Sequence, residues 1–256
     1  MERLSTVRLT RAMRLDLYIT EKGLSRSRTD AKALITEGAV KVNGEVVKKP
    51  AAEMLGTECV EVIVDDNRFV SRGGLKLDGA LSHFNIDVAG LSCIDVGASS
   101  GGFTDCLLRR GARRVLAVDS GKGQLAEELL CDPRVTSFEK FNAKIMTADM
   151  LPFTPDMAVM DVSFISAKLI IPAVYDCLSD NGGYVLLIKP QFEVGPRGVG
   201  KGGIVKDKKM RDNAVREVVE FAEKIGFYTV GLIESPIKGG DGNTEYLAYF
   251  RKGVRI

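Results

Sequence analysis

Short apolar runs alternate with segments of helical periodicity from residue 71 onward, and this alternation limits the possible folds more than any other feature. Apolar runs bounded by polar turns predict buried strands, and the segments between them predict helices. The predicted strands are LSCIDVGA, RVLAVDS, VTSFEKF, MAVMDVS, YVLLIKP, FYTVGLIES and EYLAYFRK. Such an alternation is typical of a doubly wound, mostly parallel sheet of the α/β class. We therefore expect a seven-stranded α/β sheet in this part of the chain.

The charge of the chain is distributed unevenly. Residues 1–50 contain 11 Lys and Arg against 6 Asp and Glu, a net charge of +5, whereas the remaining residues contain 25 against 28, a net charge of −3. This asymmetry indicates a basic module joined to a near-neutral one. We expect a first domain over residues 1–62, a linker over 63–70 and a second domain over 71–256.

The basic module has the pattern of a small α+β domain. A short helix ending at Gly23 precedes a second helix that starts near Ser25 and ends at Gly38. Asn43-Gly44 is the preferred two-residue turn of a β-hairpin, so VKVNGEVVKK predicts two strands. Basic side chains on these elements are the candidate RNA contacts: Arg14, Arg26, Arg28, Lys32, Lys41, Lys48 and Lys49.

This module resembles the S-four (alpha-L) RNA-binding domain. The residues that carry the resemblance are Arg14-Leu15-Asp16, Ser25-Arg26-Ser27-Arg28, Ala33-Leu34-Ile35, Gly38 and Val42-Asn43-Gly44. The resemblance implies that the second helix and the hairpin bind structured RNA, largely through its backbone. Contacts of Lys and Arg with phosphates give salt-sensitive affinity with little sequence choice. The alternative is a small charged dimerisation module.

Cysteine and histidine usage narrows the chemistry. The five cysteines are widely spaced and form no C-x-x-C pair, which is typical of a reducing compartment. His83 is the single histidine, so a His-rich zinc site is excluded, and we expect no metal. The N-terminus lacks the apolar core of a secretory signal, and no apolar run reaches the roughly 18 residues of a membrane span. We expect a cytoplasmic protein that does not bind membranes.

A glycine-rich turn, Asp95-Val-Gly97-Ala-Ser-Ser-Gly101-Gly102-Phe103, follows the first strand of the second domain. Such a turn lets a ligand approach the backbone at the carboxyl edge of the sheet. Ser99 stands where dinucleotide sites have their middle glycine, and Asp95 suits a cationic ligand better than a pyrophosphate. Asp119 ends the next strand, where a carboxylate can accept both ribose hydroxyls. These features favour S-adenosylmethionine over NAD, and the alternative is a purely structural turn.

A second glycine-rich segment, Gly195 to Lys201, fits most of a phosphate-binding P-loop. Gly202 follows it in place of the Ser or Thr that would bind Mg²⁺, so we do not expect a nucleotide site. We expect a flexible basic loop over the substrate, with Arg197 and Lys201 as RNA contacts. The alternative is a disordered surface loop.

Four charged residues stand at predicted strand tips or helix starts: Lys76, Asp161, Lys189 and Glu245. Open α/β sheets place their active sites at strand tips, and buried charges there are unfavourable unless they are paired. Taken singly, each could be a strand-end charge that reaches solvent. In order and context, the four resemble the K-D-K-E tetrad of FtsJ-like 2′-O-ribose methyltransferases. Together with SRGGLKL, DVGASSGGF, DVSFIS and KPQFE, they make the chain resemble the TlyA family, often labelled haemolysin A.

The resemblance implies a Rossmann-like class I methyltransferase that uses S-adenosylmethionine. It implies methylation of ribosomal RNA, free or in ribosomal subunits, at cytidine 2′-hydroxyls, and we favour a monomer. Its cofactor pattern carries over to Asp95, Gly97, Gly101, Gly102, Phe103, Asp119 and Asn142. The last of these follows the third strand and has a second interpretation as a turn residue.

The reaction explains why lysines are needed. A ribose hydroxyl is a poor nucleophile, so its proton must leave as the oxygen attacks the methyl group. We assign Lys189 as the base, Lys76 as the cation that tunes it or anchors the hydroxyl, and Asp161 and Glu245 as orienting acids. The alternative is that Lys189 stays charged and only positions the hydroxyl.

Two other functions are compatible with parts of the sequence. A non-catalytic RNA-binding factor for ribosome assembly would keep the fold without the chemistry, and the intact tetrad argues against it. A direct cytolysin would need a membrane-inserting hairpin or helix, and the sequence shows neither.

Overall fold

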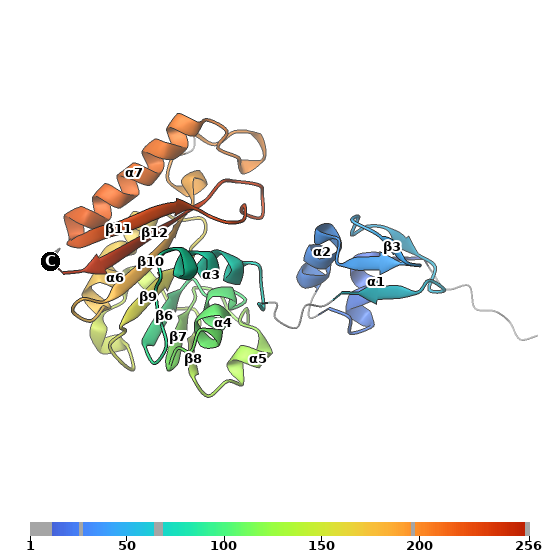
Figure 1. Ribbon diagram of the computed structural model, residues 1–256, viewed down its shortest axis with the longest axis horizontal. Helices are drawn as coiled ribbons and strands as arrows, with labels where there is room; N and C mark the ends of the chain where they lie inside the picture. Colours follow the sequence, from blue (N-terminus) through green and yellow to red (C-terminus); the bar gives the residue numbers. More distant parts are fainter. Residues whose placement is uncertain (1–11, 26–27, 64–68, 196–197, 254–256) are drawn as a thin grey trace, which may run out of the picture. The chain divides into compact units, whose positions relative to one another are not determined.

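The computed structural model describes residues 12–25, 28–63, 69–195 and 198–253 (Figure 1). The chain divides into two compact units, Met1–Arg68 and Phe69–Ile256. Each unit has its own apolar core and is described separately. In the described residues, no helix is long and apolar enough to cross a membrane.

The first unit packs two helices and short strands around a small apolar core. Its elements are β1 Met13–Arg14, α1 Leu15–Glu21, α2 Arg28–Glu37, β2 Val40–Val42, β3 Glu45–Val46, β4 Glu53–Met54 and β5 Val60–Val62. One sheet has the order β3-β2-β5, and β1 pairs with β4. Asn43 and Gly44 have φ angles of 52° and 84°, as the turn between β2 and β3 requires. The predicted helix–helix–hairpin pattern is therefore present.

The described residues of the second unit form five α-helices and seven strands, besides short 3₁₀ turns. They are α3 Gly73–His83, β6 Ser92–Val96, α4 Gly102–Arg109, β7 Arg114–Val118, α5 Glu127–Leu130, β8 Val135–Phe138, β9 Met157–Met160, α6 Ile171–Cys177, β10 Gly183–Ile188, α7 Lys208–Ile225, β11 Phe227–Glu234 and β12 Tyr246–Lys252. Helix α5 is shorter than the predicted segment QLAEELLCD, because Ala126 still has an extended conformation as its N-cap.

The second unit is built on a seven-stranded sheet with the order β11-β12-β10-β9-β6-β7-β8. Strands β6, β7, β8, β9 and β10 pair in parallel, and β12 runs antiparallel to both β10 and β11. The sheet is therefore mostly parallel, as the sequence predicts. From β6 the chain continues outward to β7 and β8 and then returns to β9 on the other side. This reversal places the switch point of the sheet, where such folds bind ligands, at the ends of β6 and β9.

Two apolar layers cover the sheet, one on each face. Side chains of α6 and α7 pack on one face in a cluster that includes Val174 and Val218. Side chains of α3 and α4 pack on the other face in a cluster that includes Leu77 and Leu107. All six residues of β10 are buried, which explains why this strand reads as a continuous apolar run.

Candidate active site

Lys189 and Asp161 meet where two adjacent strands end. Asp161 directly follows β9, Lys189 directly follows β10, and Nζ of the lysine lies 2.5 Å from Oδ1 of the aspartate. The lysine side chain is 11% exposed and the aspartate side chain 21%. Nζ also donates a hydrogen bond of 2.8 Å to Oγ of Ser163. The lysine is thus held by two oxygen-bearing side chains from the loop that follows β9.

Lys76 and Glu245 form a second, more deeply buried ion pair. Lys76 lies in the first half of α3, Glu245 directly precedes β12, and Nζ lies 2.6 Å from Oε2. Their side chains are only 10% and 3% exposed. Gln191 donates a 3.4 Å hydrogen bond from Nε2 to the other carboxylate oxygen of Glu245. Since Gln191 follows Lys189 by two residues, it links the two ion pairs through the segment after β10.

A cavity of about 540 Å³ opens at the switch point of the sheet. Its lining residues include Val96, Gly97, Ser99, Val118, Asp119, Ser120, Gln124, Phe141, Asn142, Ala143, Lys144, Asp161, Val162, Ser163, Phe164, Ile165 and Ile170. The volume falls within the range of small-molecule sites. Asp161 and Ser163 line the cavity and also contact Lys189, so the first ion pair lies at its edge.

Asp119 is fixed by the backbone around it. Its Oδ2 accepts a hydrogen bond of 2.8 Å from the N–H of Ser99, and its Oδ1 accepts one of 2.7 Å from the N–H of Gly121. The side chain still lines the cavity. Each carboxylate oxygen keeps acceptor capacity, so the group is suited to receive two hydroxyls of a ligand.

Gly97 gives the cavity room at the end of β6. Its φ of +86° lies in the left-handed region, and a Cβ there would collide with the backbone carbonyl of Asp161 and stand 3.0 Å from Cγ1 of Val162. The glycine therefore lets the loops after β6 and β9 approach each other closely.

Asp95 is completely buried beneath this turn. Its Oδ2 accepts a hydrogen bond of 2.7 Å from Oγ1 of Thr104, and among the described residues Oδ1 has no hydrogen-bond partner. Burial raises the pKa of Asp95 to about 7, and the nearby Asp161 and Asp119 carboxylates add to the shift. A cation near the turn would favour the ionised form. Asp95 itself is not among the residues that line the cavity.

Three further residues that were predicted to bind the cofactor make packing contacts inside the protein. Gly101 has a φ of +96° and leaves room for the Leu129 side chain, and Gly102 leaves room for Ser71. Phe103 is 3% exposed in the core beside α3. None of Gly101, Gly102 and Phe103 is among the residues that line the cavity.

Asn142 caps a local turn and also lines the cavity. Its Oδ1 accepts a 3.1 Å hydrogen bond from the N–H of Lys144, which caps a short 3₁₀ turn. The residue also lines the cavity.

Several residues at the site carry no signal in the sequence that would mark them as site members. Phe164 is 92% exposed, has a φ of 64°, lines the cavity and contacts the ring of Phe192 at 5.2 Å between centroids. A bulky residue with positive φ is an outlier, and such strain is concentrated at functional sites. Ser163, Gln191 and Lys144 also belong here. Ser163 and Phe164 lie in the segment DVSFIS, and Gln191 lies in KPQFE. In these segments, the chemistry was assigned to the charged residues Asp161 and Lys189.

The candidate RNA contacts of the first unit lie at least partly on its surface. Lys32, Lys48 and Lys49 are exposed, and Lys41 is half-buried. Arg14 and Arg28 both pair with Asp16. Arg26, Arg197 and the side chain of Lys201 lie outside the described part of the chain.

Comparison with known proteins agrees with the fold. A model of the FtsJ-like methyltransferase family matches residues 69–252, and a model of the S4 domain matches residues 13–53. The chain is 44% identical to the 16S/23S rRNA (cytidine-2'-O)-methyltransferase TlyA of Mycobacterium tuberculosis strain CDC 1551, over 95% of this chain and 91% of the relative. It is also 44% identical to hemolysin A of Brachyspira hyodysenteriae, over 93% and 99%. A solved structure from Streptococcus thermophilus shares 41% identity with a TM-score of 0.75, over 95% of this chain and 89% of that one.

The fold and these family matches thus define a methyltransferase that carries an additional domain of an RNA-binding type. The chain belongs to the FtsJ-like methyltransferase family and carries an S4 domain before the catalytic one. The family implies the use of S-adenosylmethionine as methyl donor.

Proposed function

We propose that this protein methylates the 2′-hydroxyl of a cytidine in ribosomal RNA. The observation that carries the proposal is the Lys189–Asp161 ion pair at the edge of the switch-point cavity. The M. tuberculosis relative is named for this reaction. An S4 domain at residues 13–53 supports RNA as the substrate, as a free molecule or in a ribosomal subunit in the cytoplasm.

The residues around the cavity fit S-adenosylmethionine. We assign Asp119, which lines the cavity, to receive the two ribose hydroxyls, and we assign the amide group of Asn142 to contact the adenine. Gly97 keeps the backbone turn open, and the buried Asp95 supplies a negative charge near a cationic ligand. When bound, the cofactor supplies a methyl group on a positively charged sulfur. In this proposal, the packing contacts of Gly101, Gly102 and Phe103 stabilise the glycine-rich turn.

The chain's own part in the reaction is to hold the hydroxyl and take its proton. A neutral lysine amine has two hydrogens and one lone pair. Ser163 accepts one hydrogen from Lys189 and the Asp161 carboxylate lies beside Nζ, so the lone pair is left for the proton of the ribose hydroxyl. If Lys189 instead stays charged, the same contacts aim an ammonium hydrogen at the hydroxyl oxygen and position it.

Lys76 and Glu245 complete the tetrad. Glu245 holds the Lys76 ammonium group at 2.6 Å, and Gln191 holds the carboxylate from its other oxygen. We assign Lys76 to anchoring the hydroxyl oxygen or tuning Lys189, and Glu245 to fixing the orientation of Lys76. The exposed ring of Phe164 offers a stacking surface for the target base at the cavity.

The test uses purified protein, labelled S-adenosylmethionine, and either free ribosomal RNA or intact subunits from cells that lack this gene. We expect label in 2′-O-methylcytidine, which resists alkaline cleavage of the RNA chain. Label only on a base, or no label on any of these substrates, would overturn the proposal. RNA binding without any label would support the non-catalytic assembly factor instead.

A further inference from the structure

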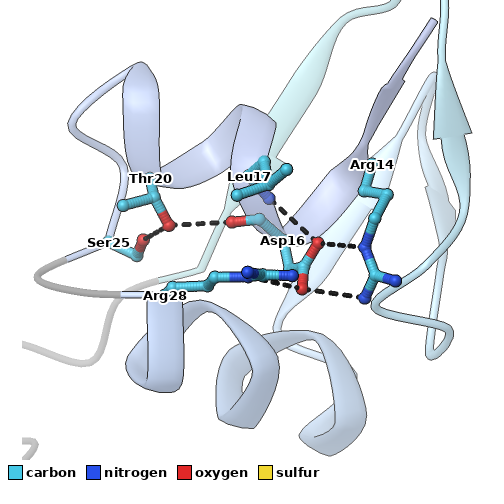
Figure 2. A network of polar contacts seen from close by, with 6 residues as sticks. All are labelled: Arg14, Asp16, Leu17, Thr20, Ser25 and Arg28. Atoms are coloured by element: carbon cyan, nitrogen blue, oxygen red, sulfur yellow. Dashed lines mark hydrogen bonds and ion pairs between the residues drawn. The ribbon is translucent and has the colours of Figure 1, made fainter.

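A buried carboxylate in the first unit holds two arginines (Figure 2). Asp16 is 0% exposed, and its Oδ1 accepts hydrogen bonds from Nε of Arg14 at 2.9 Å and from the N–H of Leu17 at 3.1 Å. Its Oδ2 accepts from Nη2 of Arg14 at 3.0 Å and from Nε of Arg28 at 3.2 Å. All four bonds end on one carboxylate, which is therefore fully used within the protein.

The three charged residues come from separate elements. Arg14 ends β1, Asp16 lies in the first turn of α1, and Arg28 is the first residue of α2. Thr20 strengthens this junction, since its Oγ1 donates to the backbone oxygen of Asp16 at 2.8 Å and lies 3.2 Å from Oγ of Ser25 (Figure 2). The carboxylate thus fixes the first arginine relative to the start of the second helix.

The cluster presents positive charge outward. Two guanidinium groups and one carboxylate leave a net charge of +1, and the arginine side chains are 44% and 50% exposed. The hydrogen bond from Arg14, with a further contribution from Arg28, lowers the pKa of Asp16 to about 2, so the carboxylate stays ionised at physiological pH. Guanidinium edges that are not used by Asp16 can bind an anion such as a phosphodiester.

An ordinary surface ion pair looks different. Among the described residues of the second unit, the side chain of Asp132 pairs only with Arg134, two residues away, with 2.7 Å between Nη2 and Oδ2 and a carboxylate side chain that is 21% exposed. That pair closes a local turn. Asp16 instead is fully buried and orders two cations that stand 14 positions apart in the sequence, 14 and 28, at the surface of the unit.

We propose that Asp16 is a positioning residue for RNA binding, which holds Arg14 and Arg28 side by side so that both contact the phosphate backbone of one RNA segment. The inference deepens the proposed function and rests on it for the identity of the RNA. A free arginine side chain loses much rotational freedom when it binds, and prior fixing by Asp16 removes most of that loss before the RNA arrives.

The variant Asp16→Asn separates this proposal from simple electrostatics. It removes one negative charge, so a charge-only account predicts tighter RNA binding. The amide keeps the size of the carboxylate but turns an N–H toward the guanidinium donors, so at least one arginine is released. We expect binding of ribosomal RNA to weaken by about tenfold, and the slope of log K against log salt to become shallower by about one phosphate contact.

Two matched controls remove the same charge elsewhere. Asp132→Asn takes the partner from an arginine in the second unit, and Glu61→Gln neutralises an exposed side chain of the first unit. We expect neither to weaken RNA binding. Kinetics add a second measurement: in Asp16→Asn the KM for RNA rises, whereas kcat at saturating RNA and the Kd for S-adenosylmethionine stay unchanged.

Unfolding of the first unit must be separated from loss of positioning. Circular dichroism and thermal unfolding report whether Asp16→Asn keeps the unit folded. If it does not, Arg28→Lys serves instead, since it keeps the charge and Asp16 but loses the guanidinium fork. Weaker binding by a folded variant supports the proposal, and unchanged or tighter binding by a folded Asp16→Asn or Arg28→Lys overturns it. A wild-type protein that binds RNA but transfers no methyl group would overturn the proposed function alone.

Discussion

Nζ of Lys189 lies 2.5 Å from Oδ1 of Asp161, and this ion pair joins the ends of the adjacent strands β9 and β10. The pairing follows from the sheet, because Met160 is in register with Leu186 and the two parallel strands end at the same edge. The carboxylate also lines the cavity of the switch point. The ion pair therefore lies at the edge of that cavity, which supports the role of base that we propose for Lys189.

Replacing Lys189 with alanine tests this placement. General base catalysis contributes about 10²–10⁴-fold to rate, so we expect Lys189→Ala to lower kcat for methyl transfer by at least about 100-fold. The Kd for S-adenosylmethionine, measured by calorimetry, should stay within about twofold, since Lys189 is not among the residues that line the cavity. Lys168→Ala is the control, because it removes a more exposed lysine that pairs with Glu217. Equal activity of the two variants would contradict the assignment.

The Lys76–Glu245 pair should show strong coupling. Removing one member leaves the other charge buried, with side chains only 10% and 3% exposed, and this costs about 3–5 kcal/mol of unfolding free energy. We expect Lys76→Met and Glu245→Gln each to be destabilising, and the double variant to be much less destabilised than the two single effects together. Denaturant unfolding of the four proteins gives the coupling energy. Additive effects would show that the pair is not a unit.

Gly97 should tolerate no side chain. Gly97→Ala combines a left-handed φ with a collision against the carbonyl of Asp161, whereas Gly123→Ala has a φ of +63° and no atom within 4 Å of its new Cβ. The control should therefore lose about 1–2 kcal/mol from the backbone alone. Gly97→Ala should lose about 1–3 kcal/mol more from crowding, together with affinity for S-adenosylmethionine. Equal stability and affinity in both variants would show that the close approach has no effect.

Asp95 should make stability depend on pH. Its pKa rises from an ordinary value of 3.8 to about 7 on folding, so the folded state binds the proton more tightly than the unfolded state. The stability from this group is complete below about pH 4 and is lost as the pH rises through 7. We expect Asp95→Asn to gain in Tm relative to the wild type between pH 5 and pH 8, in protein without cofactor. A constant difference in Tm over this range would contradict the shift.

Much of the fold follows from local sequence. The apolar runs predicted all seven strands of the large sheet, and Asn43-Gly44 predicted the hairpin of the first unit. These signals are local, because periodicity and turn chemistry act within a few residues. The length of helix α5 was overestimated, because the extended backbone of Ala126, the residue before the helix, depends on its surroundings and not on the local sequence.

The sequence could place charged residues at strand ends, but it could not show which distant elements would come together. Lys189 and Asp161 could be placed together from the order of the strands. The pairing of Lys76 with Glu245 joins elements that are 169 residues apart and required the tertiary structure. The exposed ring of Phe164 shows the other gap, because an aromatic residue in a sequence is ordinarily assigned to the core.

The most direct test maps 2′-O-methylation over the ribosomal RNA of cells that lack this gene. The cells are complemented with the wild-type protein or with Lys189→Ala at equal protein levels. We predict that one or more cytidines lose the ribose methyl group in the deletion strain, regain it with the wild-type protein and do not regain it with the variant. An unchanged methylation profile in the deletion strain, or full recovery with Lys189→Ala, would contradict the account.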